Sequence, residues 1–434
     1  TGLSCARHLY ARDIAFSVVD SRSQPPGLQE LLQEMPGVMV YAGEYPSSLL
    51  ADVSELIVSP GVALDEPIVL QAVEAGIDVV GDIDLFVREA SAPVVGITGS
   101  NAKSTVTQLL GQMAEDAGVN VGVGGNLGPP ALELLEESRE LYVLELSSFQ
   151  LERAAKLNLA VATILNVSAD HLDRHGDMSA YQQAKHRIFL GCKSAVFNGD
   201  NRLTIPLLPA DVRQVSWRLG EPEQGGFGLV QRGEEEHLCR GAELLMPVSK
   251  LSLPGRHNIA NALAALALGS SVGLPVTAMT ATLSQFKGLP HRCELIAQRG
   301  GVSFVNDSKG TNVGATEAAL AGLGGDRNIL LLAGGQSKGA DFSVLQAVVK
   351  RHCKQVLLFG EDAALIEEAL SGSSAALVRV SSIEEAVAVA ASAAKPGDCV
   401  LLSPACASFD MFAGFEQRGD AFGAAVAALP EVAQ

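Results

Sequence analysis

The sequence predicts an α/β protein with three domains, and three observations lead to this prediction. Short apolar runs rich in β-branched residues alternate with helical patterns along the chain, which is typical of parallel βαβ units. A glycine turn, GITGSNAKST (residues 96–105), stands between one such strand and one such helix. The chain of 434 residues is 47% hydrophobic, which is enough for several cores. We expect a Rossmann-like N-terminal domain (residues 1–81), a central phosphate-loop α/β domain (residues 82–288) and a Rossmann-like C-terminal domain (residues 289–434).

The N-terminal domain is expected to contain one small doubly wound sheet. The run TGLSCARHLYARD reads as the glycine turn and first helix of a βαβ unit, and IAFSVVD, SELIVS and IDVVG read as strands around the helix PIVLQAVEAG. The chain opens on a helix, so we expect the first strand of the unit to be missing. Asp20 ends a strand where such folds often hold a ribose hydroxyl, but a solvated acid at a strand end is at least as good an interpretation.

The central domain is expected to open with a phosphate-binding loop. Such loops follow the pattern G-x-x-x-x-G-K-[ST], and this turn departs from it because Gly96 is displaced and Ala102 replaces the second glycine. The flanks nevertheless supply the required order of strand (APVVGIT), turn and helix (STVTQLLGQMAEDAG). Lys103 would neutralise phosphates and Ser104 would reach Mg²⁺, and the alanine is tolerable unless it needs a positive φ. The alternative is an ordinary βα turn with a solvated lysine, and the context favours a nucleotide.

Two further strands of the central domain end in polar residues. Glu145 is the last residue of LYVLE, and His171 lies in ADHLDRHG after a second apolar run. A carboxylate beside a phosphate loop suits Mg²⁺, whereas a helix cap is the alternative for Glu145. His171 is a candidate metal ligand or general base, although a lone histidine is more often structural. Lys185, in the helical run YQQAKHRIF, reads as a surface lysine, and residues 200–252 read as a peripheral β insertion before a helix.

The C-terminal domain shows a regular βα rhythm with polar strand ends. Arg292 in GLPHRCEL could reach phosphates across a cleft, or could be a surface arginine. FVNDSKGTN (residues 304–312) crowds more polar groups at a strand end than a plain turn needs. Lys338 follows a diglycine, and Ser408 ends another strand. These edges predict a second binding site, for an anion or a zwitterion.

Composition limits the classes of partner. The formal charge of −18 argues against a nucleic-acid or anionic-membrane surface, so anionic substrates must meet local Lys and Arg clusters. Seven scattered cysteines without C-x-x-C spacing fit a reducing cytosol, and we expect no structural metal. No apolar run reaches the ~20 residues of a membrane span, and no signal peptide is recognisable. We expect a cytoplasmic monomer with small-molecule substrates.

Together these motifs resemble the Mur ligase superfamily over the whole chain. The resemblance rests on GITGSNAKST, GGNLGPPALE, LELSSFQL, SADHLDRHG, LPGRHNIANALAA, GLPHRCE, FVNDSKGTN, LLAGGQSKGADF and LSPACASFDMF. Within the superfamily, NDSKGTN and SPACASFD resemble the D-glutamate-adding member, and the D-N-P-R motif of the diaminopimelate-adding members is absent. The resemblance implies ATP-dependent joining of D-glutamate to UDP-N-acetylmuramoyl-L-alanine through an acyl phosphate, in peptidoglycan precursor synthesis.

The resemblance also implies roles for individual residues. Catalysis would involve Lys103, His171, Lys185 and Arg292, with Lys185 carried as a carbamate, and Mg²⁺ would be held by Ser104, Glu145, His171 and Lys185. The residues expected to bind ATP are Gly99, Ser100, Asn101, Ala102, Lys103, Ser104, Thr105, Asn258, Asn261, Arg292, Asp307 and Lys309. Those expected to bind the other substrates are Thr1, Asp20, Ser21, Arg22, Asn126 and Ser147 for the UDP-sugar, and Lys309, Thr311, Lys338, Ser408 and Phe415 for D-glutamate.

The sequence departs from the pattern of the superfamily at two places, and two alternative functions stay open. Ala102 stands in place of the more usual glycine, and the missing first strand would remove part of the uridine site, so we expect weak binding of that substrate. A phosphate-loop kinase or ATPase, or a different Mur or folylpolyglutamate-type ligase, is the alternative enzyme. A kinase or ATPase would leave the NDSKGTN and SPACASFD edges without a purpose. A non-catalytic nucleotide-binding module is the alternative of a different class.

Overall fold

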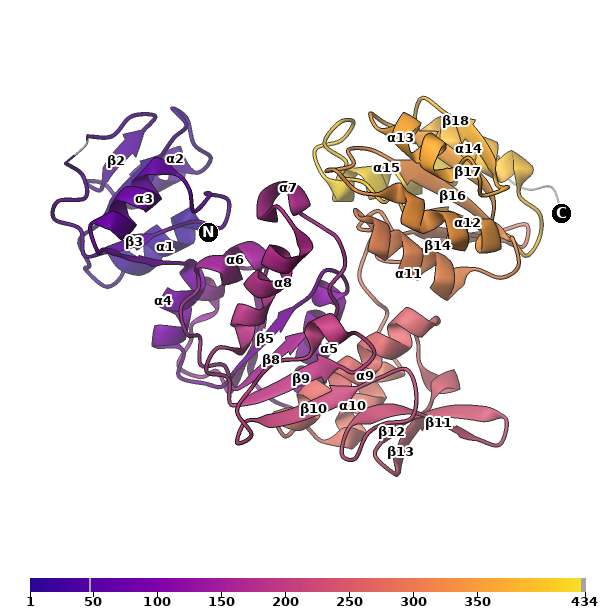
Figure 1. Ribbon diagram of the computed structural model, residues 1–434, viewed down its shortest axis with the longest axis horizontal. Coiled ribbons are helices and arrows are strands. Elements are labelled where there is room, and N and C mark those ends of the chain that lie inside the picture. Colours follow the sequence, from indigo (N-terminus) through magenta and orange to yellow (C-terminus); the bar gives the residue numbers. More distant parts are fainter. Residues whose placement is uncertain (47, 431–434) are drawn as a thin grey trace.

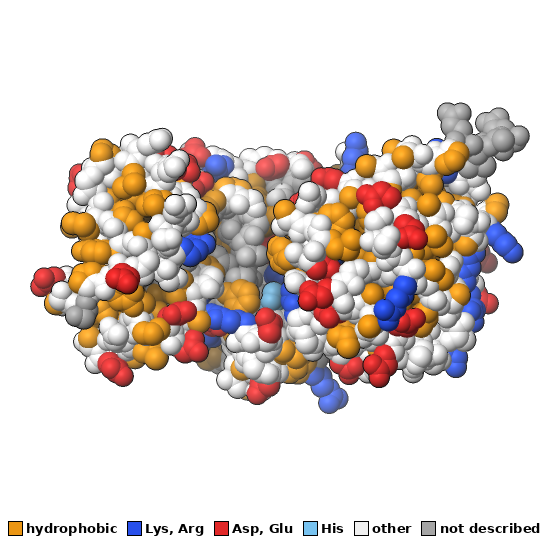
Figure 2. Space-filling model, turned by 90° about the horizontal axis from the view of Figure 1, so that it is seen from above, with side chains coloured by type: hydrophobic (Ala, Val, Ile, Leu, Met, Phe, Trp, Pro, Cys, Tyr) orange, Lys and Arg blue, Asp and Glu red, His pale blue; other side chains and the backbone are white. Residues whose placement is uncertain are grey.

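The computed structural model describes residues 1–46 and 48–430 and shows three α/β domains. In Figure 1 the N-terminal and C-terminal domains lie on either side above the central domain. Seen from above in Figure 2, the molecule is hollowed between the two outer domains, and Lys, Arg and His side chains line the hollow. None of the helices in the described residues is long and apolar enough to cross a lipid bilayer.

The N-terminal domain contains two separate pairs of parallel strands. Strand β1 pairs with β2, and β3 pairs with β4. The prediction of one small sheet is therefore wrong in detail, because no strand in the described residues lies between β1 and β3 to join the pairs by hydrogen bonds. The elements are α1 (Gly2–Tyr10), β1 (Ser17–Asp20), α2 (Leu28–Glu34), β2 (Met39–Ala42), β3 (Glu55–Ile57), α3 (Pro67–Glu74) and β4 (Asp78–Val80).

The central domain is built on one sheet whose described strands have the order β13-β12-β11-β10-β9-β8-β5-β7-β6. Strands β5 to β10 are parallel, and β11 to β13 extend the sheet with antiparallel pairs, as the predicted β insertion requires. Its strands are β5 (Val94–Thr98), β6 (Val121–Gly125), β7 (Leu141–Glu145), β8 (Val161–Ile164), β9 (Ser194–Asn198), β10 (Arg213–Trp217), β11 (Phe227–Arg232), β12 (Glu235–Arg240) and β13 (Glu243–Pro247).

Helices cover both faces of the central sheet. One apolar core joins the sheet to α5, α9 and α10, and a second core joins its other face to α4, α6 and α8. The carboxyl end of β7 carries Glu145, and those of β5 and β8 lead into the segments that carry Lys103 and His171. The helices are α4 (Asp82–Glu89), α5 (Lys103–Asp116), α6 (Ser148–Arg153), α7 (Leu172–His175), α8 (Met178–His186), α9 (Arg256–Ser271) and α10 (Val276–Leu283), with 3₁₀ turns η1 (Ala131–Leu134), η2 (Arg187–Phe189), η3 (Arg202–Thr204) and η4 (Val248–Lys250).

The C-terminal domain is a doubly wound sheet with strand order β14-β15-β19-β16-β17-β18, in which only β14 is antiparallel among the described strands. Helices α11 to α13 share a core with one face, and α14 and α15 share a core with the other. Its elements are β14 (Glu294–Arg299), β15 (Val302–Asn306), α11 (Val313–Leu323), β16 (Ile329–Gly334), η5 (Phe342–Leu345), α12 (Gln346–His352), β17 (Cys353–Phe359), α13 (Ala363–Leu370), β18 (Ala376–Arg379), α14 (Ile383–Ala393), β19 (Cys399–Leu402) and α15 (Phe415–Ala427).

Candidate active site

The predicted phosphate loop joins β5 to α5. All of β5 is buried, because its apolar residues lie at the centre of the sheet, and α5 begins directly at Lys103. Ala102 has φ 67°, in the left-handed region. From the sequence, an alanine is expected to be tolerated here only if the residue does not need a positive φ. The structure shows that it does. The turn from strand into helix imposes this backbone conformation, which is strained for a residue with a Cβ atom.

Two lysines converge on one carbonyl oxygen of this loop. Lys103 Nζ donates to the Gly99 oxygen at 2.8 Å and to the Ser100 oxygen at 3.0 Å, and Lys185 Nζ donates to the same Gly99 oxygen at 2.9 Å. Burial, followed by the nearby Lys103 charge, lowers the pKa of Lys185 well below its ordinary value. Burial also lowers the pKa of Lys103. Two full ammonium charges on one oxygen repel each other, so the site favours a Lys185 without its positive charge.

The interpretation of Lys185 as a surface lysine is wrong. Its side chain is only 1% exposed, and its amine lies 4.5 Å from the centre of the Tyr181 ring. Helix α8 carries it under the phosphate loop, a placement that results from the packing of α8 against the central sheet. The apolar pattern of that helix gives no sign of it.

Glu145 ends β7 with one carboxylate oxygen unpaired. The residue is 3% exposed; Asn126 Nδ2 donates to its Oε1 at 2.7 Å, while its buried Oε2 has no hydrogen-bond partner in the described part of the chain. The cap of α6 is Ser147, whose hydroxyl accepts from the Gln150 amide, so Glu145 is not a helix cap. A buried, unpaired carboxylate oxygen is suited to a cation.

His171 lies at the start of α7, beside Asp170. Its Nε2 is 3.6 Å from Asp170 Oδ2, and its ring packs edge-on against Phe149. Burial lowers the pKa of His171, which leaves the imidazole neutral and able to offer a lone pair. In residues 1–46 and 48–430 no three His, Cys, Asp or Glu side chains are grouped as a metal cage. A sparse set of protein oxygens suits Mg²⁺, which takes its remaining ligands from phosphates and water.

The C-terminal domain reaches directly into the phosphate loop. Arg292 Nη2 donates to Ser104 Oγ at 2.6 Å, although 188 positions separate them. Asp307 is buried and accepts from Ser403 Oγ at 2.7 Å, and burial raises the pKa of Asp307 to about 6. Lys309 Nζ lies 3.9 Å from the centre of the Phe415 ring, and burial, with Arg292 and Lys103 nearby, lowers the pKa of Lys309 to about 8.

The polar strand ends of this domain are tied together by Arg418, which sequence reasoning missed. Its guanidinium is fully buried and donates to Ser308 Oγ at 3.0 Å, to the Ser308 oxygen at 2.8 Å and to the oxygens of Cys406 and Ala407 at 3.1 and 3.3 Å. Ser308 Oγ in turn donates to the Phe415 oxygen at 2.8 Å. The network holds the NDSKGTN and SPACASFD edges against α15. Thr311, Lys338 and Ser408 are carried on those edges and on the loop after β16.

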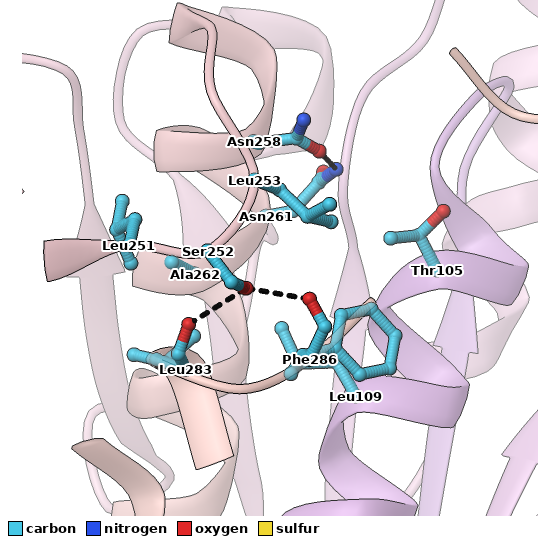
Figure 3. A pocket seen from close by; sticks show the side chains of 10 residues that line it. All are labelled: Thr105, Leu109, Leu251, Ser252, Leu253, Asn258, Asn261, Ala262, Leu283 and Phe286. Carbon is cyan, nitrogen blue, oxygen red and sulfur yellow. Dashed lines mark hydrogen bonds between the residues drawn. The ribbon is translucent and has the colours of Figure 1, made fainter. Parts of the chain in front are cut away.

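A separate pocket lies between α5 and α9 (Figure 3). Asn258 and Asn261 reach into it from α9, and Asn261 Nδ2 donates to Asn258 Oδ1 at 3.4 Å. The walls of the pocket are mainly apolar with a few amide groups, and its volume of about 20 Å³ is little more than one water molecule needs. The lining residues are Thr105, Leu109, Leu251, Ser252, Leu253, Asn258, Asn261, Ala262, Leu283 and Phe286.

The predicted residues of the N-terminal domain stand apart from this cluster. Asp20 accepts two hydrogen bonds from the Arg22 guanidinium, at 2.8 and 2.7 Å, and this interaction lowers the pKa of Asp20. Thr1 and Ser21 are exposed. No hydrogen bond in the described residues joins these side chains to Asn126 or Ser147, which lie on the central domain.

Comparisons with known proteins identify the family of this chain. Residues 97–269 match the Mur ligase middle domain, residues 1–81 match the MurD-like N-terminal domain of Mur ligases, and residues 291–406 match the glutamate ligase domain of Mur ligases. A UDP-N-acetylmuramoylalanine–D-glutamate ligase of Pseudomonas aeruginosa is 52% identical, with 99% of this chain and 96% of the relative covered. The enzyme of the same name from Nitrosococcus oceani is 52% identical over 98% of this chain and 94% of the relative.

Solved structures with little sequence identity share the fold. The UDP-N-acetylmuramate–alanine ligase MurC of Thermotoga maritima has a TM-score of 0.60 at 17% identity and covers 98% of this chain and 97% of its own. A pseudomurein peptide ligase type C of Methanothermus fervidus has a TM-score of 0.58 at 19% identity and covers 92% of this chain and 93% of its own.

Proposed function

This chain belongs to the Mur ligase family, and from that membership we propose how its residues carry out the reaction. The chain is an ATP-dependent ligase of peptidoglycan precursor synthesis that adds D-glutamate to UDP-N-acetylmuramoyl-L-alanine. The alternative of a phosphate-loop kinase or ATPase is not supported, because relatives sharing half of the residues over nearly the full length are D-glutamate ligases.

We propose a division of labour among residues 1–81 for the UDP-sugar, residues 82–288 for ATP and residues 289–434 for D-glutamate and part of ATP. Small molecules are then the substrates, and no nucleic acid or membrane takes part. The chain acts as a monomer in the cytoplasm, and the free cysteines support the reducing compartment.

The reaction has two steps. The carboxylate of the substrate alanine is a poor acyl donor because it has no good leaving group. Its oxygen therefore first attacks the γ-phosphorus of ATP, the bond to the β-phosphate oxygen breaks and ADP leaves. The amine of D-glutamate then attacks the carbonyl carbon of the acyl phosphate, and the tetrahedral intermediate expels inorganic phosphate. Lys103 and Arg292 offset the repulsion between the two anions that must meet in the first step.

ATP would bind along the phosphate loop with its base beside Asn258 and Asn261 of α9. Gly99, Ser100, Asn101, Ala102 and Thr105 of the loop would lie beside the phosphates. Asn258 and Asn261 would contact the base, and Asp307 and Lys309 would approach from the C-terminal domain. The support for this arrangement is the convergence of Lys103, Lys185 and Arg292 at the loop.

Mg²⁺ would be held by Ser104, Glu145 and His171, with Lys185 as a carbamate. The unpaired Glu145 Oε2 and the neutral His171 ring fit this assignment. The ion would screen charge on the transferred phosphoryl group. Carbamylation requires a neutral amine, and the lowered pKa of Lys185 provides one; the product is an anion, which ends the repulsion with Lys103.

The other two substrates would occupy opposite walls of the hollow. Lys309, Thr311, Lys338, Ser408 and the Phe415 backbone would surround D-glutamate. The UDP-sugar would be bound by Thr1, Asp20, Ser21 and Arg22 of the N-terminal domain and by Asn126 and Ser147 of the central domain.

One observation carries this proposal. The hydrogen bond from Arg292 to Ser104 brings the second polar edge to the phosphate loop, so an amine held on the C-terminal domain can meet an acyl phosphate formed at the loop. A kinase would have no use for that edge.

The test is an assay of this chain with ATP and each substrate omitted in turn. We expect amide, ADP and phosphate in equal amounts only when UDP-N-acetylmuramoyl-L-alanine and D-glutamate are both present. ADP formed at the full rate without D-glutamate would point to a kinase or ATPase. Nucleotide binding without any turnover would point to a binding module.

A further inference from the structure

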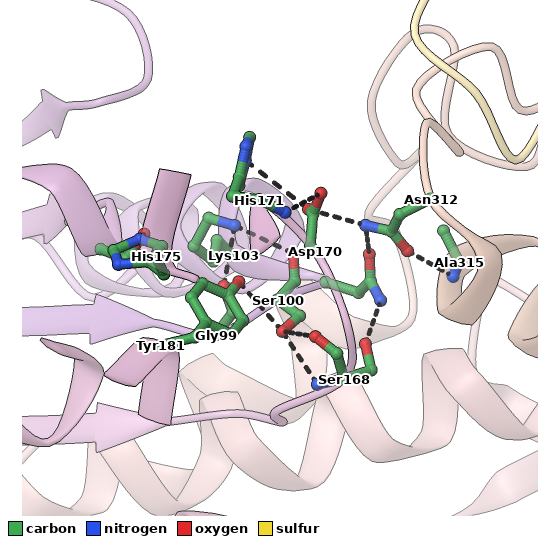
Figure 4. Close-up of polar contacts among 12 residues, drawn as sticks. Gly99, Ser100, Lys103, Ser168, Asp170, His171, His175, Tyr181, Asn312 and Ala315 are labelled. Atoms are coloured by element: carbon green, nitrogen blue, oxygen red, sulfur yellow. Dashed lines mark hydrogen bonds and ion pairs between the residues drawn. The ribbon is translucent and has the colours of Figure 1, made fainter. Parts of the chain in front are cut away.

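Asn312 uses its single side chain to bridge two domains. It stands at the start of α11 in the C-terminal domain, is 7% exposed, and its Oδ1 accepts from the Ala315 amide at 2.9 Å as the cap of that helix. Its Nδ2 donates to Asn101 Oδ1 at 3.1 Å and to Asp170 Oδ2 at 3.0 Å, both on the central domain. Figure 4 shows Asn312 turned toward Asp170 across the gap between the domains.

The two acceptors are themselves fixed parts of the site. The backbone N–H of Asn101 donates to Asn166 Oδ1 at 2.8 Å, and this bond anchors the phosphate loop. The backbone N–H of His171 donates to Asp170 Oδ1 at 3.0 Å. The side-chain amide of Asn312 is therefore hydrogen-bonded both to the phosphate loop and to the segment that carries His171. A helix cap alone would leave Nδ2 free to face water.

The backbones approach closely beside this bridge. A Cβ atom added at Gly314 would lie 2.7 Å from Ser168 Oγ and 3.1 Å from Ser168 Cβ, so a larger residue would require Ser168 to move. The contact is thus a close, buried junction in which an unpaired donor would be costly.

We propose that Asn312 is a positioning residue that sets the distance between the amino-acid site of the C-terminal domain and the phosphate loop. This proposal rests on the ligase function given above. A correct distance lets the amine of D-glutamate reach the acyl phosphate and keeps water out. When the junction loosens, water competes with the amine, and phosphate is released without amide formation.

The substitution Asn312→Asp separates the bridge from the cap. Aspartate caps helices as well as asparagine does, so α11 keeps its N-terminus. A carboxylate has no N–H to donate, and it stands next to the Asp170 carboxylate, so the junction becomes repulsive. Ser382→Ala is the matched control, because Ser382 caps α14 of the same domain by accepting from the Glu385 amide and takes no part in the junction.

Two measurements test the proposal. In steady-state assays, Asn312→Asp should raise the ratio of phosphate released to amide formed above one and lower kcat/KM for D-glutamate about tenfold, while Ser382→Ala keeps the ratio at one. A ratio that stays at one in Asn312→Asp, or that rises equally in Ser382→Ala, overturns the proposal.

The second measurement does not depend on ligation. Small-angle X-ray scattering of the ligand-free chain should give a larger radius of gyration for Asn312→Asp than for the unsubstituted chain and Ser382→Ala. An unchanged radius overturns the positioning role. An unsubstituted chain that forms no amide contradicts the ligase function instead, and the scattering result then still decides whether Asn312 holds the domains together.

Discussion

At the scale of single residues, the site is dominated by charges placed where water cannot solvate them. Lys103 and Lys185 share one carbonyl oxygen, Arg292 reaches the same loop, and the net charge of the chain is −18. Such a cluster is costly without an anion, because burial and, after it, neighbouring cations lower the pKa of Lys185 and of Lys309. The cost is offset when polyphosphate binds, so the residues are arranged for a ligand and not for stability alone.

Lys185→Ala tests the carbamate. If Lys185 carries CO₂, the substitution removes an anion beside Mg²⁺ and most activity should be lost. Acetate or formate, which can occupy the vacated space, should restore part of the rate, measured as initial velocity with and without the added carboxylate. Lys103→Ala should not respond, because its role is cationic. Full activity of Lys185→Ala, or equal rescue of both variants, would return Lys185 to a structural role.

Ala102→Gly tests the strain in the phosphate loop. Strain at an alanine in the left-handed region costs roughly 1–2 kcal/mol of folding free energy. Glycine removes this strain, but its greater freedom in the unfolded chain lowers stability by about 0.4–1 kcal/mol. We expect Ala102→Gly to stabilise the chain by up to about 1 kcal/mol and Ala102→Val to destabilise it, measured by urea denaturation. Ala117→Gly at the C-cap of the same helix, where φ is −83° and an alanine is unstrained, should not stabilise the chain. Equal signs for the two glycine variants would rule out strain at Ala102.

Lys309 predicts a pH dependence of D-glutamate use. Its pKa of about 8 means that the ammonium is present below pH 8 and is lost as the pH rises through that value. A neutral amine no longer attracts a carboxylate, so kcat/KM for D-glutamate should fall above pH 8. Lys309→Arg keeps its charge and should flatten the profile between pH 8 and about 9. Identical profiles for the two proteins would assign the titration to another group.

At the scale of elements, the central and C-terminal domains meet through α9 and α11. Asn312 lies at one end of α11, and near the other end the ring of His257, from α9, packs on Gly322, where an added Cβ would lie 2.3 Å from His257 Nδ1. Neither ring nitrogen of His257 has a hydrogen-bond partner in the described residues. Burial lowers the pKa of His257, so the ring is neutral in the folded chain.

This contact predicts that acid weakens the junction. In the unfolded chain His257 takes up a proton near its ordinary pKa of about 6.5, whereas the folded chain resists protonation, so stability falls as the pH drops below that value. The slope from one group is at most about 1.4 kcal/mol per pH unit. His257→Leu should make urea stability less sensitive to pH between 6.5 and 5, with His186→Leu, outside the contact, as the control. An unchanged slope in His257→Leu would contradict the assignment.

At the scale of the whole molecule, the central and C-terminal domains contribute different chemical groups to one hollow. The phosphate loop belongs to the central domain, the cations and amides around the proposed amino-acid site belong to the C-terminal domain, and α15 is tied to that site by the buried Arg418. Burial lowers the pKa of Arg418 to about 10, which still leaves it charged at neutral pH. The arrangement of the domains therefore decides whether the amine of D-glutamate can reach the acyl phosphate.

Amino-acid selectivity should accordingly lie in the C-terminal domain. Lys338→Ala removes a proposed partner of a D-glutamate carboxylate, and losing a charged hydrogen bond of ~1.5–3 kcal/mol should raise the KM for D-glutamate about tenfold or more. The KM for ATP should change little. Lys350→Ala, at an exposed position of α12, is the matched control. Equal increases in both KM values for Lys338→Ala would place the amino-acid site elsewhere.

Local sequence determined much of this protein. The periods of apolar residues gave the βα alternation, the order of strand, glycine turn and helix located the phosphate loop, and polar strand ends marked the second edge. These features span about ten residues each, so they can be read without knowing the fold. The family resemblance added Lys185, which no local pattern singles out.

Tertiary structure decided the rest, because convergence depends on residues far apart in the chain. Lys185 is buried against a loop 86 positions away, and Asn312 bonds to Asn101 across 211 positions. The positive φ of Ala102, the burial of Arg418 and the division of the N-terminal strands into two pairs likewise follow from how elements pack and pair. A short run of sequence fixes which element forms and which side chains it carries. Which of those side chains lose water and meet one another is fixed only when distant elements close around them.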